Sequence, residues 1–193
     1  MRCVFVIVLS FLCMNQHVLA QDQHDAEQMI KSKLDAVFLV LQKKDLSEQE
    51  KSSKIDEIVS PMFDFPRMAM LSLGRRYWPG LDKEEQGRFT ALFIKRMKDA
   101  YRGKLMLYTD EEVVYEVPVQ TAKKIRIPTY LISKDNRISI LYKFYKAKGG
   151  WKIYDVEIEG VSVIKTYRSQ FSQVLQNGTI DDLLLKLNEP VDS

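Results

Sequence analysis

WKIYDVEIEGVSVIKTYRSQF, residues 151–171, begins with the pattern of a β-strand and ends with that of a helix. Apolar residues alternate along the segment up to Ile158, and the alternation stops at Gly160. Beyond the glycine, Ser162 is a favourable N-cap, and apolar residues then recur at spacings of three and four. The stretch therefore predicts a strand that turns through a short corner into a helix.

Asp155 is the unusual residue of this strand, because most of its neighbours are apolar. Strict alternation places it on one face with Trp151, Ile153 and Glu157. We expect a structural carboxylate that pairs with a cation of the following helix. The alternative is an acid or base at the rim of a pocket.

Three further runs with a period of two precede this strand. They cover Val113 to Val119, Ile125 to Leu131, and Ile138 to Phe144. Pro128 interrupts the second run, and proline cannot donate a backbone hydrogen bond, so this run is expected at a sheet edge or a bulge. Short turns between consecutive strands favour antiparallel pairing. The sequence thus predicts a twisted antiparallel sheet of about four strands.

Helical periodicity dominates the chain on both sides of the sheet. The expected helices cover 24–43, 47–60, 64–74 and a segment from Asp82 to about Tyr101, and two more follow the sheet from Ser162 and from Thr179. Asp82 and Glu85 have the spacing of a capping box. Helices segregated from a meander of strands indicate an α+β fold, and residues 21–193 have the length of a single domain.

The first twenty residues have the pattern of a secretory signal peptide. Arg2 precedes an uncharged apolar run over residues 3–14, and Ala20 is a small residue suited to cleavage. The run is shorter than the roughly 20 apolar residues that span a bilayer. We expect cleavage after Ala20.

Removal of this segment would limit the available chemistry. Residues 21–193 contain no cysteine and a single histidine, His24. A disulfide framework, a thiol nucleophile and a Cys/His metal site are therefore not expected. The net charge of +3 is too small to indicate nucleic-acid binding. We expect neither a catalytic site nor a cofactor or metal.

Four segments resemble the MlaC family, the periplasmic phospholipid carriers of Gram-negative bacteria that are also known as toluene-tolerance auxiliary proteins. They are FDFPRMAMLSLGRRYW (63–78), the helix from Phe89 to Tyr101, GGWKIYDVEIEGVSVIKTYRSQF (149–171) and GTIDDLLLKL (178–187). The similarity extends over nearly all of residues 21–193 and is weakest over 21–60 and 105–135.

The resemblance implies a sheet and helices that enclose an apolar cavity for glycerophospholipid. It also implies a periplasmic monomer that makes transient contacts with membrane complexes. These are an outer-membrane lipoprotein complex and an inner-membrane ABC transporter with an MCE-domain ring, and lipid shuttling between them maintains outer-membrane asymmetry. No catalytic motif is implied, and headgroup preference, the number of acyl chains and the direction of transport stay open.

Candidate cavity residues are apolar or aromatic positions of the strands and helices. They are Phe93, Met97, Tyr101, Ile140, Tyr142, Phe144, Val156, Ile158, Val163 and Tyr167. Lys165 and Arg168 lie off the apolar stripe of their helix, so we expect them at the cavity mouth, facing headgroups or acidic partner surfaces. Two acyl chains would cost on the order of 20 kcal/mol to expose to water. The cavity should therefore have a volume of about 1,000 Å³ or more.

Two other interpretations use the same residues. One is a small α+β enzyme of the isomerase or dehydratase kind, in which Asp155 acts with Tyr154 or Tyr167 in an apolar pocket. The other is an envelope adaptor protein with a solid core, because the same apolar residues would also fill an ordinary core.

Overall fold

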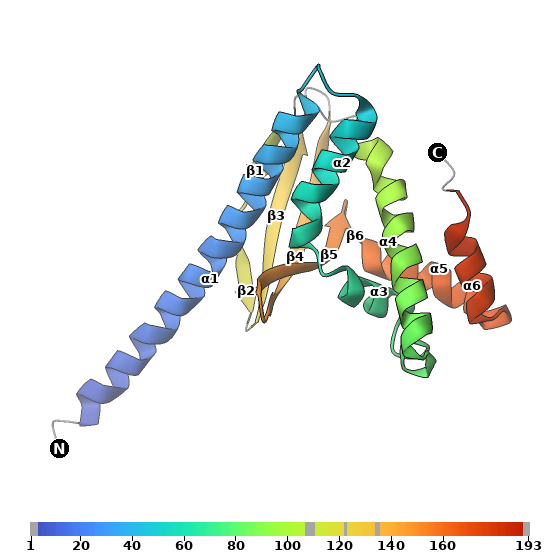
Figure 1. Cartoon of the computed structure of the whole chain (residues 1–193). Coiled ribbons are helices and arrows are strands. Elements are labelled where there is room, and N and C mark those ends of the chain that lie inside the picture. The colour runs from blue at the N-terminus through green and yellow to red at the C-terminus, as the bar shows by residue number, and fades with distance from the viewer. Residues whose placement is uncertain (1–3, 107–110, 122, 134–135, 191–193) are drawn as a thin grey trace.

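The computed structural model describes residues 4–106, 111–121, 123–133 and 136–190. Within these residues, six α-helices flank a central sheet, which confirms the predicted α+β fold (Figure 1). The helices are α1 (Val4–Leu41), α2 (Glu48–Val59), α3 (Phe65–Leu73), α4 (Lys83–Met106), α5 (Val163–Asn177) and α6 (Ile180–Asn188). Two 3₁₀ turns, η1 (Ser60–Met62) and η2 (Trp78–Gly80), link the early helices.

The sheet is antiparallel and contains more strands than expected. Its strands are β1 (Glu112–Tyr115), β2 (Val119–Thr121), β3 (Lys124–Ile132), β4 (Arg137–Ala147), β5 (Gly150–Ile158) and β6 (Val161–Ser162). Their order is β1-β3-β4-β5-β6, and β2 pairs with β3 beside β1. The expectation of about four strands was too low because the first predicted run is divided between β1 and β2, and because the corner after β5 forms β6.

Pro128 lies in β3, between β4 on one side and β1 and β2 on the other, so its expected place at a sheet edge was wrong. The Pro128 carbonyl accepts a hydrogen bond from the Glu116 backbone N–H at 3.0 Å. In an antiparallel strand the nitrogen and the carbonyl of one residue point to the same side. The proline nitrogen therefore faces Glu116, just beyond the end of β1, so the missing donor falls where the pairing of β1 with β3 has ended.

A β-bulge changes the alternation of β5. Lys143 of β4 pairs with Asp155, but Phe144 pairs with Ile153, so Tyr154 is an extra residue. Ile153 therefore shares a face with Val156 and Ile158. Asp155 points to the opposite face with Lys143. The expectation that Asp155 shares a face with Ile153 was wrong for this reason.

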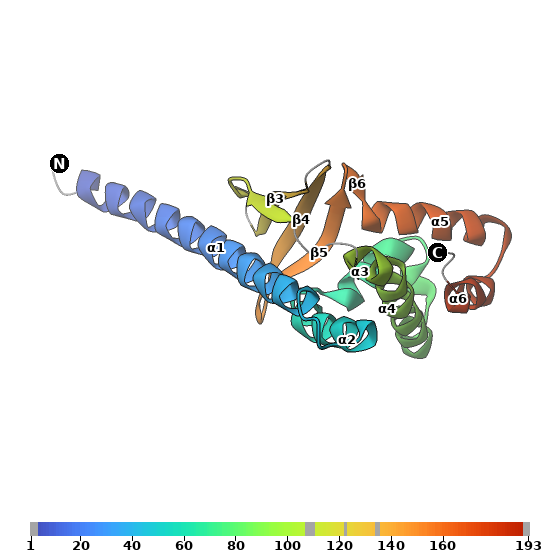
Figure 2. The ribbon, with the colours of Figure 1, turned by 90° about the horizontal axis from the view of Figure 1, so that it is seen from above.

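The helix boundaries follow local capping. The Glu85 carboxylate accepts from the Asp82 N–H at 2.8 Å and the Asp82 carboxylate accepts from the Glu85 N–H at 2.9 Å, which confirms the predicted start of α4. The Ser162 hydroxyl accepts from the Lys165 N–H at 3.1 Å, and Thr179 caps α6. α1 begins earlier than the helix expected over 24–43 and continues through residue 20, and its N-terminal part projects beyond the sheet (Figures 1 and 2).

The apolar core is divided into three clusters. The largest joins α3, α4, α5 and α6, the second joins α1 to the inner face of the sheet, and the third joins the C-terminal end of α1 to α2. Figure 2 shows α1 and α2 on one side of the sheet and α5 and α6 beyond its β6 edge. The space between the clusters is where the candidate site lies.

Candidate functional site

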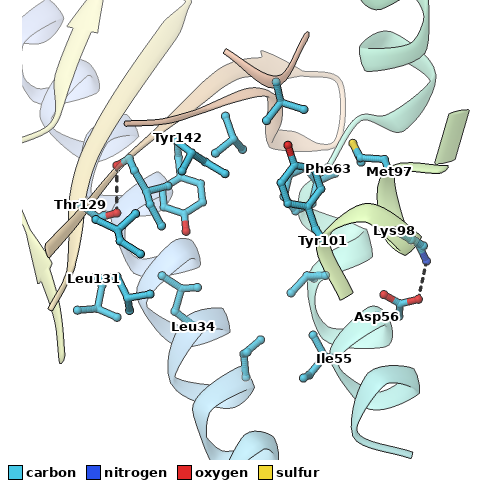
Figure 3. Close-up of a pocket in the computed structure, with 18 of the residues that line it drawn as sticks. Leu34, Ile55, Asp56, Phe63, Met97, Lys98, Tyr101, Thr129, Leu131 and Tyr142 are labelled. Atoms are coloured by element: carbon cyan, nitrogen blue, oxygen red, sulfur yellow. Dashed lines mark hydrogen bonds and ion pairs between the residues drawn. The ribbon is translucent and has the colours of Figure 1, made fainter. Parts of the chain in front are cut away.

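A cavity of about 470 Å³ lies between the sheet, α1, α2 and α4 (Figure 3). It is lined by Leu34, Val37, Phe38, Leu41, Ser52, Ile55, Asp56, Val59, Phe63, Phe65, Met68, Met97, Lys98, Tyr101, Val113, Thr129, Leu131, Ile138, Ile140, Tyr142, Val156, Ile158, Glu159 and Val163. Most of these side chains are apolar. The fold is therefore hollow at this point, although the volume is about half of that expected from the sequence.

The sheet contributes its inner face in rows of paired residues. The outermost row consists of Val113, Leu131 and Ile138, which lie side by side on β1, β3 and β4. Thr129, Ile140 and Ile158 form the next row, and Tyr142 pairs with Val156 in the third. Thr129 does not present a free hydroxyl, because it donates to the Ile140 carbonyl at 3.1 Å. These rows form a wall that is nearly free of hydrogen-bonding groups.

The next row of the sheet explains why Phe144 does not line the cavity. Phe144 pairs with Ile125 and Ile153, and all three are fully buried. They pack with Ala26 and Ile30 of α1 in the second core cluster. The closed end of the inner face is thus filled by side chains, whereas the first three rows face open space.

α4 is divided in the same way along its length. Phe89 and Phe93 are fully buried, and Phe93 packs against Tyr167 of α5 with ring centroids 5.3 Å apart. Further along the helix, Met97 and Tyr101 line the cavity. One amphipathic face of α4 therefore supports a solid core with its first half and a cavity with its second.

Seven of the ten candidate cavity residues are placed in the wall. They are Met97, Tyr101, Ile140, Tyr142, Val156, Ile158 and Val163. Phe93, Phe144 and Tyr167 do not line the cavity and lie instead in packed core, where Phe93 and Tyr167 belong to the first cluster and Phe144 to the second. Their assignment to the wall is corrected accordingly.

α1 and α2 supply wall positions that the sequence analysis missed. On α1 they are Leu34, Val37, Phe38 and Leu41, and on α2 they are Ser52, Ile55, Asp56 and Val59. Each set has the i, i+3, i+4, i+7 spacing of a helix face. The spacing was visible in the sequence of α1, but it does not show whether the face meets a solid core or a cavity.

Three charged residues line the cavity within the described part of the chain: Asp56, Lys98 and Glu159. The Lys98 amine lies 3.1 Å from Asp56 Oδ2, so this ion pair joins α4 to α2 (Figure 3). Glu159 is held differently, because its carboxylate accepts the Ser139 backbone N–H. Glu159 and Gly160 both have positive φ and form the two-residue turn between β5 and β6.

The tyrosines near the cavity are neutral at physiological pH. Burial raises the pKa of Tyr142 well above its ordinary value, with the neighbouring Tyr115 adding to the effect. Burial also raises the pKa of Tyr167 to about 12. The pKa of Tyr115 is raised to about 12 by burial and by the negative charges of Asp35 and Glu27. Of these three tyrosines, Tyr142 lines the cavity, where it adds a hydroxyl group but no charge.

Asp155 is a structural carboxylate at the corner between β5 and α5. It is 6% exposed and accepts hydrogen bonds from the Ser162 hydroxyl at 2.8 Å and the Ile164 N–H at 3.2 Å. Its ion-pair partner is Lys143, at 3.0 Å, which also pairs with Glu157. Burial opposes the charge of Lys143, but these carboxylates outweigh it and raise its pKa. Asp155 is not among the residues that line the cavity.

Lys165 and Arg168 do not line the cavity either, and neither of them is the partner of Asp155. Both are exposed on α5. Arg168 Nε donates to the Leu71 carbonyl at 2.9 Å, near the C-terminal end of α3. Its guanidinium therefore satisfies a helix-end carbonyl, where a cation is also favoured by the helix dipole. The expected position of both residues at the cavity mouth is corrected to the outer face of α5.

Neither a metal site nor a membrane-crossing helix is present in the described residues. No three His, Cys, Asp or Glu side chains there are grouped closely enough to hold a metal ion. No helix in that part of the chain combines the length and apolar character needed to cross a bilayer.

Comparison with known proteins gives a consistent result. Residues 31–189 match the family model described as MlaC protein. A solved structure with a similar fold is the phospholipid-binding protein from Ralstonia solanacearum in complex with a phospholipid. It superposes with a TM-score of 0.77 and 23% sequence identity, covering 84% of this chain and 94% of that chain.

Proposed function

Since the chain belongs to the MlaC family, we propose that it binds a glycerophospholipid by its acyl chains inside the cavity and carries it across the periplasm. Lipid would pass between an outer-membrane lipoprotein complex and an inner-membrane MCE-domain ABC transporter, so that outer-membrane asymmetry is maintained. The observation that carries the proposal is the apolar cavity between the sheet and α1, α2 and α4.

The wall chemistry suits acyl chains. Burying a methylene contributes about 0.8 kcal/mol, so even one chain of about 15 methylenes gains on the order of 10 kcal/mol in an apolar site. A volume of about 470 Å³ lies within the range of ordinary ligand pockets, about 300 to 1,000 Å³. Two chains would need more room, and α2 is the element placed to give it. It packs mainly on α1, and its described link to α4 is the Lys98–Asp56 ion pair.

The same proposal includes processing and partner contacts. Residues 1–20 act as a signal peptide, and residues 21–193 form the single lipid-binding domain, a periplasmic carrier without catalytic residues or cofactor. The exposed Lys165 and Arg168 on α5 offer a basic surface for transient contact with acidic surfaces of the membrane complexes.

Purification from the periplasm without detergent, followed by native mass spectrometry and lipid extraction, tests the proposal. We expect a one-to-one complex with glycerophospholipid. A folded protein that carries no lipid, and that acquires none from phospholipid vesicles, would show that the cavity has another purpose. A carrier role further requires that the loaded protein deliver lipid to one reconstituted complex after loading from the other.

A further inference from the structure

We propose that Asp56 and Lys98 together form a headgroup site at the edge of the cavity, which favours a zwitterionic phosphoethanolamine headgroup over an anionic one. The inference rests on the proposed function, because it requires the tails of the same lipid to occupy the cavity. It assigns a selective role to the ion pair that also joins α4 to α2.

The Asp56–Lys98 pair lies at the boundary between the apolar cavity wall and solvent. Asp56 and Lys98 line an otherwise apolar cavity, yet their side chains are 32% and 27% exposed. A lipid whose tails lie in the cavity must place its phosphate where the apolar wall ends and water begins. The third charged residue of the wall, Glu159, has its carboxylate engaged by a backbone N–H of β4. The ion pair is therefore the charged element of the described wall that is suited to meeting a headgroup.

The Phe65 ring lies within reach of a cation–π attraction to Lys98. The Lys98 amine lies 5.9 Å from the centroid of the Phe65 ring, which stacks on Phe63 with centroids 5.4 Å apart. All three residues line the cavity. An ammonium group near an aromatic face is attracted by the ring, so Lys98 can exchange its carboxylate partner for a phosphate without leaving this position.

The charge pattern of the pair matches a zwitterion. The phosphate of a phosphoethanolamine headgroup would pair with Lys98, and its primary ammonium would pair with Asp56. One internal ion pair is then exchanged for two intermolecular ones, and no charge is left without a partner. The phosphate of a phosphoglycerol headgroup would also pair with Lys98, but this headgroup has no ammonium to pair with Asp56. The Asp56 carboxylate would then lie beside a phosphate without a cationic partner of its own, which is unfavourable.

Competition between two headgroups measures the preference. Lipid-free protein is incubated with vesicles of equimolar phosphatidylethanolamine and phosphatidylglycerol with identical chains, and the bound ratio is determined by mass spectrometry. Because the pair is partly exposed, we expect about two- to fivefold enrichment of phosphatidylethanolamine at low salt. The enrichment should decline toward one in about 0.5 M salt, because screening weakens exposed pairs.

The two single variants should differ in a way that a merely structural ion pair would not produce. Asp56→Asn should bring the bound ratio close to one and leave total lipid unchanged. Lys98→Met should lower total uptake of both lipids and retain the preference, because Asp56 still disfavours the anionic headgroup. The matched controls are Asp99→Asn and Lys95→Met, which break an ion pair of 3.0 Å on α4 that does not line the cavity.

Each outcome has a defined meaning. Wild-type protein that binds lipid at the vesicle ratio in low salt overturns the headgroup site and leaves the proposed function intact. So does a shift in Asp56→Asn no larger than that in Asp99→Asn. Wild-type protein that takes up no lipid overturns both. Should Asp56→Asn fail to fold by circular dichroism, the double variant Asp56→Asn/Lys98→Met leaves no charge without a partner and must show a ratio of one.

Discussion

Val156→Asp places a carboxyl group in the cavity wall and tests whether lipid tails occupy it. Val156 lies on β5 opposite Tyr142, in the third row of the sheet wall. In the empty cavity, water can solvate the new carboxylate. Once acyl chains fill the space, the carboxylate loses that water and finds an apolar wall instead. An ionised group in such a site takes up a proton rather than stay charged.

The cost follows from the pKa of an aspartate. Protonating a carboxyl group of pKa about 3.9 at pH 7 costs about 1.36 kcal/mol for each unit of difference, or about 4 kcal/mol in total. Lipid affinity should therefore fall about a thousandfold. The complex binds one proton more than the free protein does, so acid favours the complex. Affinity should recover about tenfold for each pH unit as the pH falls from 7 toward 4.

Lipid uptake from vesicles at several pH values between about 5 and 7 measures this effect. Val119→Asp is the control, because it introduces the same carboxyl group at a strand residue that is 53% exposed. Circular dichroism must show that both variants are folded. Two results would refute the reasoning: a folded Val156→Asp protein that binds as wild type does at pH 7, and a loss of binding that acid does not reverse.

Three further predictions concern stability and processing. Asp155→Ala removes the carboxylate that pairs with Lys143 and accepts hydrogen bonds at the start of α5. It should lower the free energy of unfolding, measured by chemical denaturation, by about 3–5 kcal/mol. A loss below about 1 kcal/mol would contradict the buried role of this carboxylate. Arg168→Ala should cost about 0.5–1.5 kcal/mol through its lost bond to the Leu71 carbonyl, because that bond is exposed to water, and bound lipid should be unchanged. Loss of lipid would instead connect Arg168 to the cavity. N-terminal sequencing of exported protein should give Gln21, and a chain that begins at Met1 would exclude cleavage.

Much of the fold could be predicted because its helix ends depend on neighbouring residues. The capping hydrogen bonds depend on local sequence alone: they join Asp82 to Glu85, and Ser162 to Lys165 three residues later. Thr179 caps α6 in the same manner. Such contacts survive any tertiary arrangement, so the sequence is sufficient to find them.

The sheet was less predictable because its details depend on pairing across strands. The bulge at Tyr154 exists only relative to Lys143 and Phe144 of β4, and it reverses the face on which Asp155 lies. Pro128 is acceptable in an interior strand because β1 and β2 are interrupted opposite it. Both the bulge and the break opposite Pro128 depend on a neighbouring strand, so the sequence of a single strand does not reveal them.

The cavity wall was the least predictable feature. Phe93 and Met97 lie one helical turn apart on α4, yet the first is in solid core and the second faces open space. Apolar periodicity identifies the buried side of a helix without measuring how much volume its neighbours fill. The contribution of α2 was missed for a related reason, because its segment has few apolar residues and the family resemblance is weakest there.

The separation of the core into three clusters has a consequence for how the molecule melts. The clusters share a few partly buried side chains, namely Phe63, Val156 and Val59, and the cavity lies between them, so one cluster can loosen while the others keep most of their apolar contacts. Bound acyl chains would touch α1, α2, α4 and the sheet at once. We therefore expect the empty protein to show a calorimetric enthalpy larger than its van't Hoff enthalpy, and the loaded protein to show the two equal. Bound lipid would then make the transition cooperative, and the lipid-free protein would be the form most open to proteases.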